Sequence, residues 1–329
     1  MGTKQPGNLQ LSFQPRRLFR GGHLQTLAGF FLQRRSRLPQ PEERLIEVAP
    51  GIQILCHCHW QVDGRNALTV IVVHGLEGSS DSGYMTGVAE KGLSAGMNVV
   101  RVNQRNCGGT DHLAPTLYNS SLSGDVAAVA KHLVEDGVAR FALAGFSMGG
   151  NLVLKTAGEW GTAAPPEFRA VAAVCPAMDL SASADALHLP GNRLYEAYFM
   201  RKLRQRFRAK AKLFPGQFDV KRLSGLRSLR DFDDKITAYY CGFDSAVDYY
   251  ARAAASNVVD RIAVPGLILH AANDPFVRLI PETRKKIAAN KNISFIEVED
   301  GGHCSFIAEA NGYDGRWAEQ QVVDFLRKF

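Results

Sequence analysis

The sequence lacks a run of about 18 apolar residues, the length at which an apolar segment is predicted to cross a membrane. Its start also lacks the charged segment followed by an apolar one that characterises a secretory signal peptide. Cysteine is sparse, with six residues scattered over 329 positions, so no disulfide framework is predicted. We therefore expect a soluble, cytoplasmic protein with free thiols.

The chain also has little excess charge outside one segment. Of its 39 lysine and arginine residues, seven lie in residues 201–212, which contain no acid, and the other 32 match the 32 acidic residues. A nucleic-acid-binding surface needs basic side chains distributed over a face of the fold. No nucleic-acid partner is therefore predicted.

What the chain does have is a regular alternation of apolar strands and helical stretches. The strands are predicted at residues 44–48, 52–60, 68–73, 97–102, 140–144, 170–175, 266–271 and 293–298, and the helices at residues 84–95, 124–135, 149–160, 281–289 and 316–328. The first two strands read as a hairpin. This order predicts an α/β fold with a mostly parallel, doubly wound, eight-stranded sheet, in which ligands bind at the carboxyl ends of the strands.

Two segments depart from the alternation. Residues 1–42 contain an apolar stretch, FQPRRLFRGGHLQTLAGFFL, and are predicted to form an N-terminal arm packed on the body. The remaining residues, 43–329, form the α/β domain. Within it, residues 180–262 hold no strand of the central sheet and are predicted to be an inserted helical cap.

The most specific motif is G-x-S-x-G at residues 145–149. It lies directly after a predicted strand and directly before a predicted helix, which is the context that this motif requires. The serine occupies a sharp, strained turn, and the flanking glycines are needed because side chains there would clash. We therefore predict that Ser147 is a catalytic nucleophile. An incidental serine in a glycine-rich turn is the alternative.

A serine nucleophile needs a neutral imidazole as its base and an acid that orients the imidazole. In this fold the chain order is serine, acid, histidine, which favours Asp274 and His303, each in a loop after a late strand. Asp179, at the end of the preceding strand, is the rival acid. His74 comes too early in the chain and is expected to hydrogen-bond locally, and His270 lies inside a buried strand.

The negatively charged intermediate of acyl transfer needs two backbone N–H donors. Met148, which follows the nucleophile, is predicted to supply one. The loop HGLEGSS after the third strand is predicted to supply the other from Leu76, because its glycines allow the backbone to turn inward.

Several segments together resemble a known family. HGLEGSSDS, NQRNCGGTDH, AGFSMGGN, AANDPFV, GGHCSF and the N-terminal FRGGHLQT are similar to the YheT-like branch of the α/β-hydrolases. The resemblance extends from about Phe13 to the C-terminal helix. It implies the triad Ser147, Asp274 and His303, and it implies esters or lipids as the substrate class.

No metal or other cofactor is predicted. Cys56, His57, Cys58 and His59 are adjacent, but on a strand the two cysteines face one side and the two histidines the other, so they cannot close one tetrahedral metal site. Cys304 lies beside His303; a redox-sensitive thiol and an inert buried cysteine are the two interpretations.

The cap is predicted to hold a helix over residues 192–213. Its apolar residues, Tyr195, Phe199, Leu203 and Phe207, recur every four positions and should face the catalytic opening or the body. Its basic residues, Arg201, Lys202, Arg204, Arg206, Arg208, Lys210 and Lys212, should all face outward. They form either a solvated face or a peripheral contact with an anionic membrane.

The leading prediction is a serine hydrolase that cleaves carboxylic esters with short-to-medium acyl groups, or lipid esters, through an acyl-enzyme. Acyl transfer to an alcohol is the first alternative, because an alcohol can intercept the same intermediate. A catalytically silent binding protein of this fold is the second.

Overall fold

The computed structural model describes residues 13–32, 34–62 and 64–329. The first twelve residues of the predicted arm, on which the cytoplasmic expectation rests, lie outside the described residues. No helix in the described ranges has the length and apolarity needed to cross a bilayer.

The described residues form one eight-stranded sheet, with the strands in the order β1-β2-β4-β3-β5-β6-β7-β8. The strands are β1 (Glu42–Ala49), β2 (Ile52–His59), β3 (Thr69–Val73), β4 (Asn98–Val102), β5 (Phe141–Phe146), β6 (Phe168–Val174), β7 (Gly266–Ala271) and β8 (Ile293–Val298). The predicted hairpin β1–β2 is antiparallel. The six strands that follow in the sheet, β4, β3, β5, β6, β7 and β8, pair with one another in parallel. The predicted mostly parallel α/β sheet is thereby confirmed.

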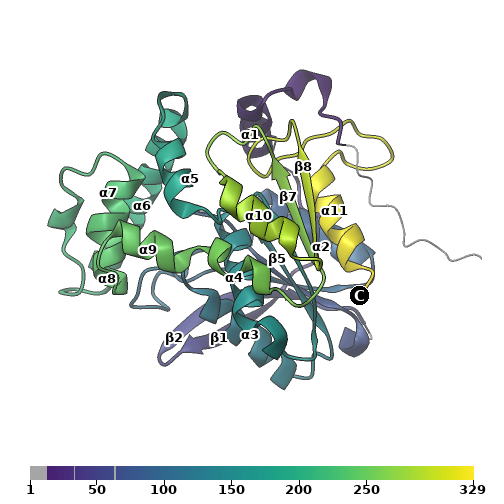
Figure 1. Ribbon diagram of the computed structural model, residues 1–329. Coiled ribbons are helices and arrows are strands. Elements are labelled where there is room, and N and C mark those ends of the chain that lie inside the picture. Colours follow the sequence, from purple (N-terminus) through teal and green to yellow (C-terminus); the bar gives the residue numbers. More distant parts are fainter. Residues whose placement is uncertain (1–12, 33, 63) are drawn as a thin grey trace, which may run out of the picture.

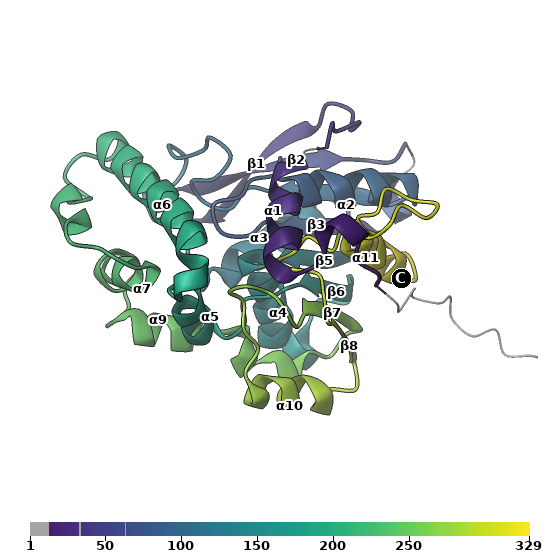
Figure 2. The same ribbon diagram turned by 90° about the horizontal axis from the view of Figure 1, so that it is seen from above.

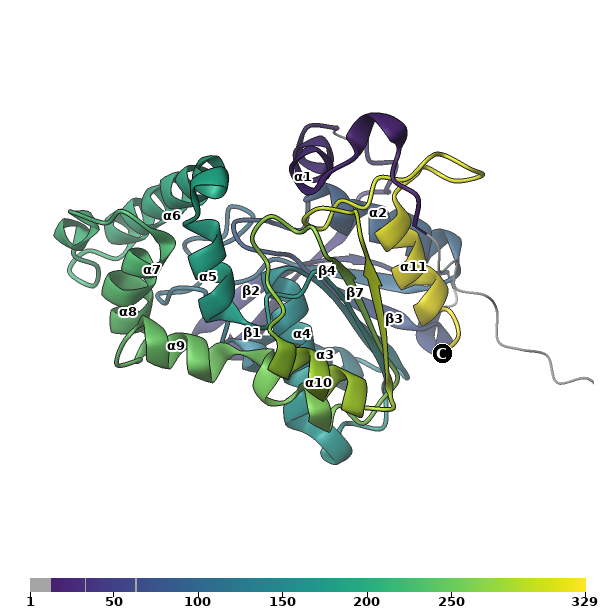
Figure 3. The same cartoon turned by 45° about the horizontal axis from the view of Figure 1, so that its top comes forward.

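Helices cover both faces of the sheet (Figures 1 and 3). The helices of the described residues are α1 (Gly22–Phe31), α2 (Gly83–Ser94), α3 (Ser123–Glu135), α4 (Met148–Trp160), α5 (Leu180–Leu187), α6 (Arg193–Leu213), α7 (Leu229–Phe232), α8 (Tyr239–Cys241), α9 (Ala246–Ala253), α10 (Pro281–Ala289) and α11 (Trp317–Leu326). Helices α3, α4 and α10 pack on one face and α2 and α11 on the other. The side chains of β3 point alternately into the two cores, which is why its sequence is continuously apolar.

The segment between β6 and β7 projects to one side of the sheet, as Figure 2 shows from above. It contains α5 to α9, and a π-helix, Asp233–Ala238, joins α7 to α8. Its longest helix, α6, packs its apolar face into a separate core that includes Leu203, Phe207, Phe232 and Ile236. This segment, called the cap below, therefore has a core of its own.

The prediction that every basic residue of α6 faces outward is wrong for Arg206 and Lys210, and Arg204 is only half-exposed and donates to the Leu226 carbonyl. The Arg206 side chain forms a bidentate ion pair with Glu77 of the body, with N–O distances of 2.9 and 3.0 Å. Lys210 is fully buried and donates to the carbonyls of Asp111 and Ala114. Both residues lie one helical turn from the inward-facing Leu203 and Phe207, so they share the inward face.

Helix α1 of the N-terminal segment packs on the edge where β7 and β8 end (Figure 3). The Gln25 side chain donates to the carbonyl of Ile307 and accepts from its N–H, at 3.0 and 2.8 Å. The contact is close, because a Cβ on Gly22 would lie 1.9 Å from the carbonyl oxygen of Asn273. The arm therefore touches both of the loops that carry predicted site residues.

Candidate active site

Ser147 occupies the turn between β5 and α4. Its φ of +54° and ψ of −119° lie in a region that side chains rarely adopt. The two flanking glycines are required by contact: a Cβ on Gly145 would lie 2.2 Å from the Gly149 carbonyl oxygen, and a Cβ on Gly149 would lie 2.2 Å from that of Val73. The chain therefore forces the strained turn that the motif predicts.

The structure brings the three residues of the predicted triad together. His303 Nε2 lies 2.9 Å from Ser147 Oγ, and His303 Nδ1 lies 2.7 Å from Asp274 Oδ2. With the proton on Nδ1, the imidazole donates to Asp274 and accepts from the serine hydroxyl. Ser147 and His303 are 156 residues apart in the chain, so this chain of hydrogen bonds is a product of the fold.

Asp274 is held in place by its own loop. Its Oδ1 accepts from the backbone N–H groups of Phe276 and Val277, at 3.1 and 2.9 Å. The rival acid, Asp179, is engaged elsewhere: it accepts from the N–H of Ile280 and the hydroxyl of Thr283. The geometry therefore favours Asp274 over Asp179 as the partner of His303.

The other two candidate histidines, His74 and His270, lie away from Ser147. His74 Nδ1 lies 2.8 Å from the Gly75 carbonyl, which is the local bond that was expected. His270 is buried within β7, and burial lowers its pKa. Neither donates to nor accepts from Ser147 among the described residues.

Charges within the triad set the protonation states. Burial lowers the pKa of His303, but the neighbouring Asp274 carboxylate and Cys304 thiol reverse this and raise the pKa well above its usual value. Burial raises the pKa of Asp274, but the charge of His303 and its hydrogen bond lower it overall. The acid is therefore ionised, and it stabilises a proton on the imidazole.

The N-terminal arm hydrogen-bonds to the backbone of His303. The N–H of His303 donates to Thr26 Oγ1 at 2.9 Å, and the Thr26 hydroxyl donates to the Gly22 carbonyl within α1. The loop is also close to the arm at Gly302, where a Cβ would lie 2.6 Å from the Gly22 oxygen. Sequence reasoning found the motif FRGGHLQT but not this contact, because no local pattern indicates a partner that lies 277 residues away in the chain.

The predicted oxyanion donors lie on two sides of the serine. Met148 is the first residue of α4, and Leu76 belongs to the loop that follows β3. A Cβ on Gly75 would lie 3.0 Å from Ser147 Cβ, so this loop approaches Ser147 closely. Both Met148 and Leu76 line the same pocket as Ser147.

The cap fixes the conformation of this loop. Glu77 has a φ of +56°, and its carboxylate accepts from Arg206 of α6 and from the Tyr118 hydroxyl, the latter at 2.6 Å. The Glu77 N–H in turn donates to the Tyr118 oxygen. Since the Glu77 side chain is buried, its charge depends on Arg206 for compensation. This connection was missed because Arg206 had been placed on the outer face.

Two thiols lie beside the base. Cys175 Sγ, His303 and Cys304 Sγ offer ligand atoms within 4.8 Å of one another, the one such group among the described residues. Burial raises the pKa of Cys304, but the Cys175 thiol and the charge of His303 lower it to about 6. A cation bound to these three side chains would prevent His303 from accepting a proton from Ser147.

Cys56 and Cys58 point into the core, away from His57, as the strand geometry predicted.

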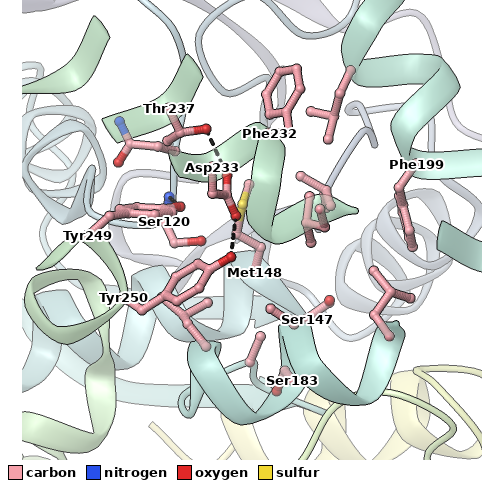
Figure 4. A pocket seen from close by; sticks show the side chains of 18 of the residues that line it. Ser120, Ser147, Met148, Ser183, Phe199, Phe232, Asp233, Thr237, Tyr249 and Tyr250 are labelled. Atoms are coloured by element: carbon pink, nitrogen blue, oxygen red, sulfur yellow. Dashed lines mark hydrogen bonds between the residues drawn. The ribbon is translucent and has the colours of Figure 1, made fainter. Parts of the chain in front are cut away.

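A pocket opens onto Ser147 (Figure 4). Its volume is about 120 Å³, and the cap supplies one wall through Phe199, Leu203 and Phe207. The apolar face of α6 therefore faces the catalytic opening, as predicted for these three residues. Tyr195 lies outside this lining and packs on Phe276, which itself packs on the His303 ring.

This fold, with a strained serine at a strand-to-helix turn, defines the class. Residues 70–312 match the family described as "Alpha/beta hydrolase family". The chain belongs to the α/β-hydrolase family, and the fold predicted from its sequence is confirmed.

The relatives place the chain more narrowly. It is 30% identical to "Putative esterase YheT" of Escherichia coli K12, over 96% of this chain and 93% of that protein. It is 29% identical to the mouse "Phospholipase ABHD3", over 85% of this chain and 68% of that protein. The predicted resemblance to the YheT-like branch is thereby confirmed.

Solved structures agree on the fold. The Pyrococcus furiosus esterase Pf2001 has a TM-score of 0.58 and 17% identity, covering 90% of this chain and 95% of that one. Est1E from Butyrivibrio proteoclasticus has a TM-score of 0.54, 17% identity, and coverage of 87% of this chain and 96% of that one.

Proposed function

We propose that this protein is a serine esterase that cleaves carboxylic esters through an acyl-enzyme. The observation that carries the proposal is the unbroken chain of hydrogen bonds from Ser147 through His303 to Asp274 at the side of an apolar pocket. The Escherichia coli relative is also named as an esterase.

In the proposed first half-reaction, the Ser147 oxygen attacks the ester carbonyl carbon while His303 Nε2 takes the hydroxyl proton. The N–H groups of Met148 and Leu76 stabilise the oxyanion, and Asp274 stabilises the imidazolium. Collapse of the tetrahedral intermediate breaks the bond between the acyl carbon and the alcohol oxygen, and this oxygen receives the proton from His303. In the second half-reaction, His303 takes a proton from water while the water oxygen attacks the acyl carbon. The bond to the Ser147 oxygen then breaks, the acid leaves, and His303 returns the proton to Ser147.

The pocket favours an apolar acyl group. Its lining includes Leu76, Leu117, Phe199, Leu203 and Phe207, and burial of each methylene of an acyl chain against such side chains contributes about 0.8 kcal/mol. This supports short-to-medium acyl esters or lipid esters as substrates, and "Phospholipase" in the name of the mouse relative points to the lipid class.

Acyl transfer to an alcohol is a second candidate. A yeast relative, 25% identical over 79% of this chain and 62% of that protein, is named "Medium-chain fatty acid ethyl ester synthase/esterase 2". The same acyl-enzyme serves both reactions, so the choice depends on whether water or alcohol reaches it first.

Hydrolysis of p-nitrophenyl esters from C2 to C16, with and without ethanol, tests both candidates. We expect turnover by the wild type and none above background by Ser147→Ala. Ser183→Ala, which changes another serine lining the same pocket, is the matched control and should remain active. Free acid as the main product with ethanol present supports hydrolysis, whereas ethyl ester supports transfer. A folded wild type that turns over no ester contradicts both and favours the silent binding protein.

A further inference from the structure

One part of the pocket differs from the apolar lining around Ser147. Figure 4 shows Asp233 between Thr237 and Tyr250, with Tyr249 beside them and Ser147 in another part of the same pocket. These four residues come from the π-helix and from α9, both in the cap. The pocket therefore has a carboxyl group in a wall that faces the substrate space.

Asp233 is buried, with 8% of its surface exposed, and both of its oxygens accept hydrogen bonds. The Thr237 hydroxyl donates to Oδ1 and the Tyr250 hydroxyl donates to Oδ2, each at 2.7 Å. Burial raises the pKa of Asp233 to about 6, and these two bonds and, more weakly, the charge of Arg230 oppose the rise. The group is thus mostly ionised at pH 7, and neither of its two hydrogen-bond donors carries a charge.

The arginines near this part of the pocket are committed to other acids. Arg230 lies over the Tyr250 ring at 5.1 Å, but it pairs with Asp185 at 2.7 Å. Arg206, which also lines the pocket, pairs with Glu77. Within the described ranges, no lysine, arginine or histidine nitrogen lies within 4.0 Å of the Asp233 carboxylate. A buried charge without a partner is costly, and a cation from outside would remove that cost.

The rings around Asp233 suit such a cation. Phe232, Tyr249 and Tyr250 all line the pocket and are 4 to 5% exposed. An ammonium group is attracted to aromatic faces as well as to a carboxylate, and the attraction is strongest where water is excluded. The backbone that carries Asp233 is a π-helix, a distortion found frequently at functional sites.

We propose that Asp233, with the rings of Phe232, Tyr249 and Tyr250, binds an ammonium group of the substrate. The preferred esters then carry a basic amine several atoms from the carbonyl that Ser147 attacks. This assignment of substrate class rests on the proposed esterase function.

Paired p-nitrophenyl esters test the proposal. One ester of each pair ends in a dimethylammonio group and the other in an isopropyl group of the same shape, with three to eight methylenes before it. At the best chain length we expect the wild type to prefer the ammonium ester by about tenfold in kcat/KM. Asp233→Asn should lower this ratio to about one. Asp244→Asn, which changes an exposed acid of the cap, should leave it unchanged.

A second variant separates recognition from support of the fold. Tyr250→Phe removes the hydroxyl that bonds Asp233 and lowers its pKa, but it keeps both the ring and the carboxylate. Measured at pH 8, where the carboxylate is ionised in both proteins, the ammonium preference should therefore remain. If the wild type shows no preference, or if Asp233→Asn keeps it, the proposal is wrong and Asp233 only anchors Tyr250. Equal loss of the preference in Tyr250→Phe and Asp233→Asn also contradicts it.

A binding measurement distinguishes failure of this proposal from failure of the esterase function. N,N-dimethylhexylammonium should raise the Tm of the wild type more than that of Asp233→Asn, whereas 1-hexanol should affect both equally. This result in a protein that hydrolyses no ester would overturn the esterase function and support the ammonium site. Turnover of alkyl esters with equal ammonium shifts in both proteins would do the reverse.

Discussion

Two buried carboxyl groups, Asp274 beside His303 and Asp233 in the pocket wall, differ in their neighbours. Asp274 is 1% exposed and accepts from the His303 imidazole and two backbone N–H groups, and its pKa is lowered. Asp233 is 8% exposed and accepts only from two hydroxyls, and its pKa is raised to about 6. Burial alone favours the neutral acid, and a cationic partner reverses that effect.

The comparison separates two uses of a buried acid. Asp274 has its partner within the chain, so its charge orients and stabilises the imidazole. Asp233 has only neutral donors, so it can receive a charge from outside. The arginines of α6 show the same contrast: Arg206 has its partner Glu77 within the chain, whereas Arg208 is exposed to solvent.

The largest expected effect comes from removing the charge of the paired acid. Asp274→Asn should keep the fold and lower kcat by on the order of 10⁴, because an amide favours the wrong imidazole tautomer. Asp179→Asn should lower kcat by less than about tenfold, because Asp179 bonds Ile280 and Thr283 instead. Steady-state kinetics on a p-nitrophenyl ester compares the two, and the reverse ranking would move the acid to Asp179.

The next effect comes from a buried cation that has its partner within the chain. Arg206→Gln leaves the buried Glu77 carboxylate without compensation and should lower the free energy of unfolding by about 3 kcal/mol. Arg208→Gln, two residues further along the same helix, should change it by less than about 0.5 kcal/mol. Urea denaturation measures both. Equal stability of the two variants would mean that the cap and the loop after β3 are not held together by this pair.

A smaller effect concerns the base. Catalysis needs neutral His303, so a raised pKa means that activity is lost on acidification at a higher pH than the usual histidine value of 6.5. The Cys304 thiol contributes to this rise. Cys304→Ser should therefore move the acid limb of kcat/KM to lower pH. A limb that stays in place, or that moves to higher pH, would show that Cys304 does not raise the pKa of His303.

The smallest effect concerns the basic residues that do face outward, Arg201, Lys202, Arg208 and Lys212. If this face meets an anionic membrane, each replacement by Gln should weaken binding to phosphatidylserine vesicles by up to about 1 kcal/mol. Cosedimentation measures it, with zwitterionic vesicles as the control. Binding that is unchanged even when all four are replaced would make this face a solvated surface.

The sequence was sufficient for features that depend on local pattern. Continuous apolar runs marked the strands that are buried on both faces, and the glycines around Ser147 marked a turn that tolerates no Cβ. Chain order then selected Asp274 and His303, which the fold brings within hydrogen-bond distance of each other.

The remaining features depend on contacts between distant segments. Arg206 was placed outward because a charged residue is usually solvated, but its partner Glu77 lies 129 residues earlier in the chain. Asp233 gave no signal, since a single acid in a cap looks the same whether buried or exposed. Thr26 was likewise invisible as a support for His303.

Labelling with a fluorophosphonate probe tests the central claim most directly, because the probe forms a covalent bond only with an activated serine. We expect one adduct on the wild type, mapped to Ser147 by mass spectrometry, and none on Ser147→Ala. Ser120→Ala, which changes another serine of the pocket, should label like the wild type. Equal labelling of the wild type and Ser147→Ala, or an adduct at another residue, would contradict the assignment of Ser147 as the nucleophile.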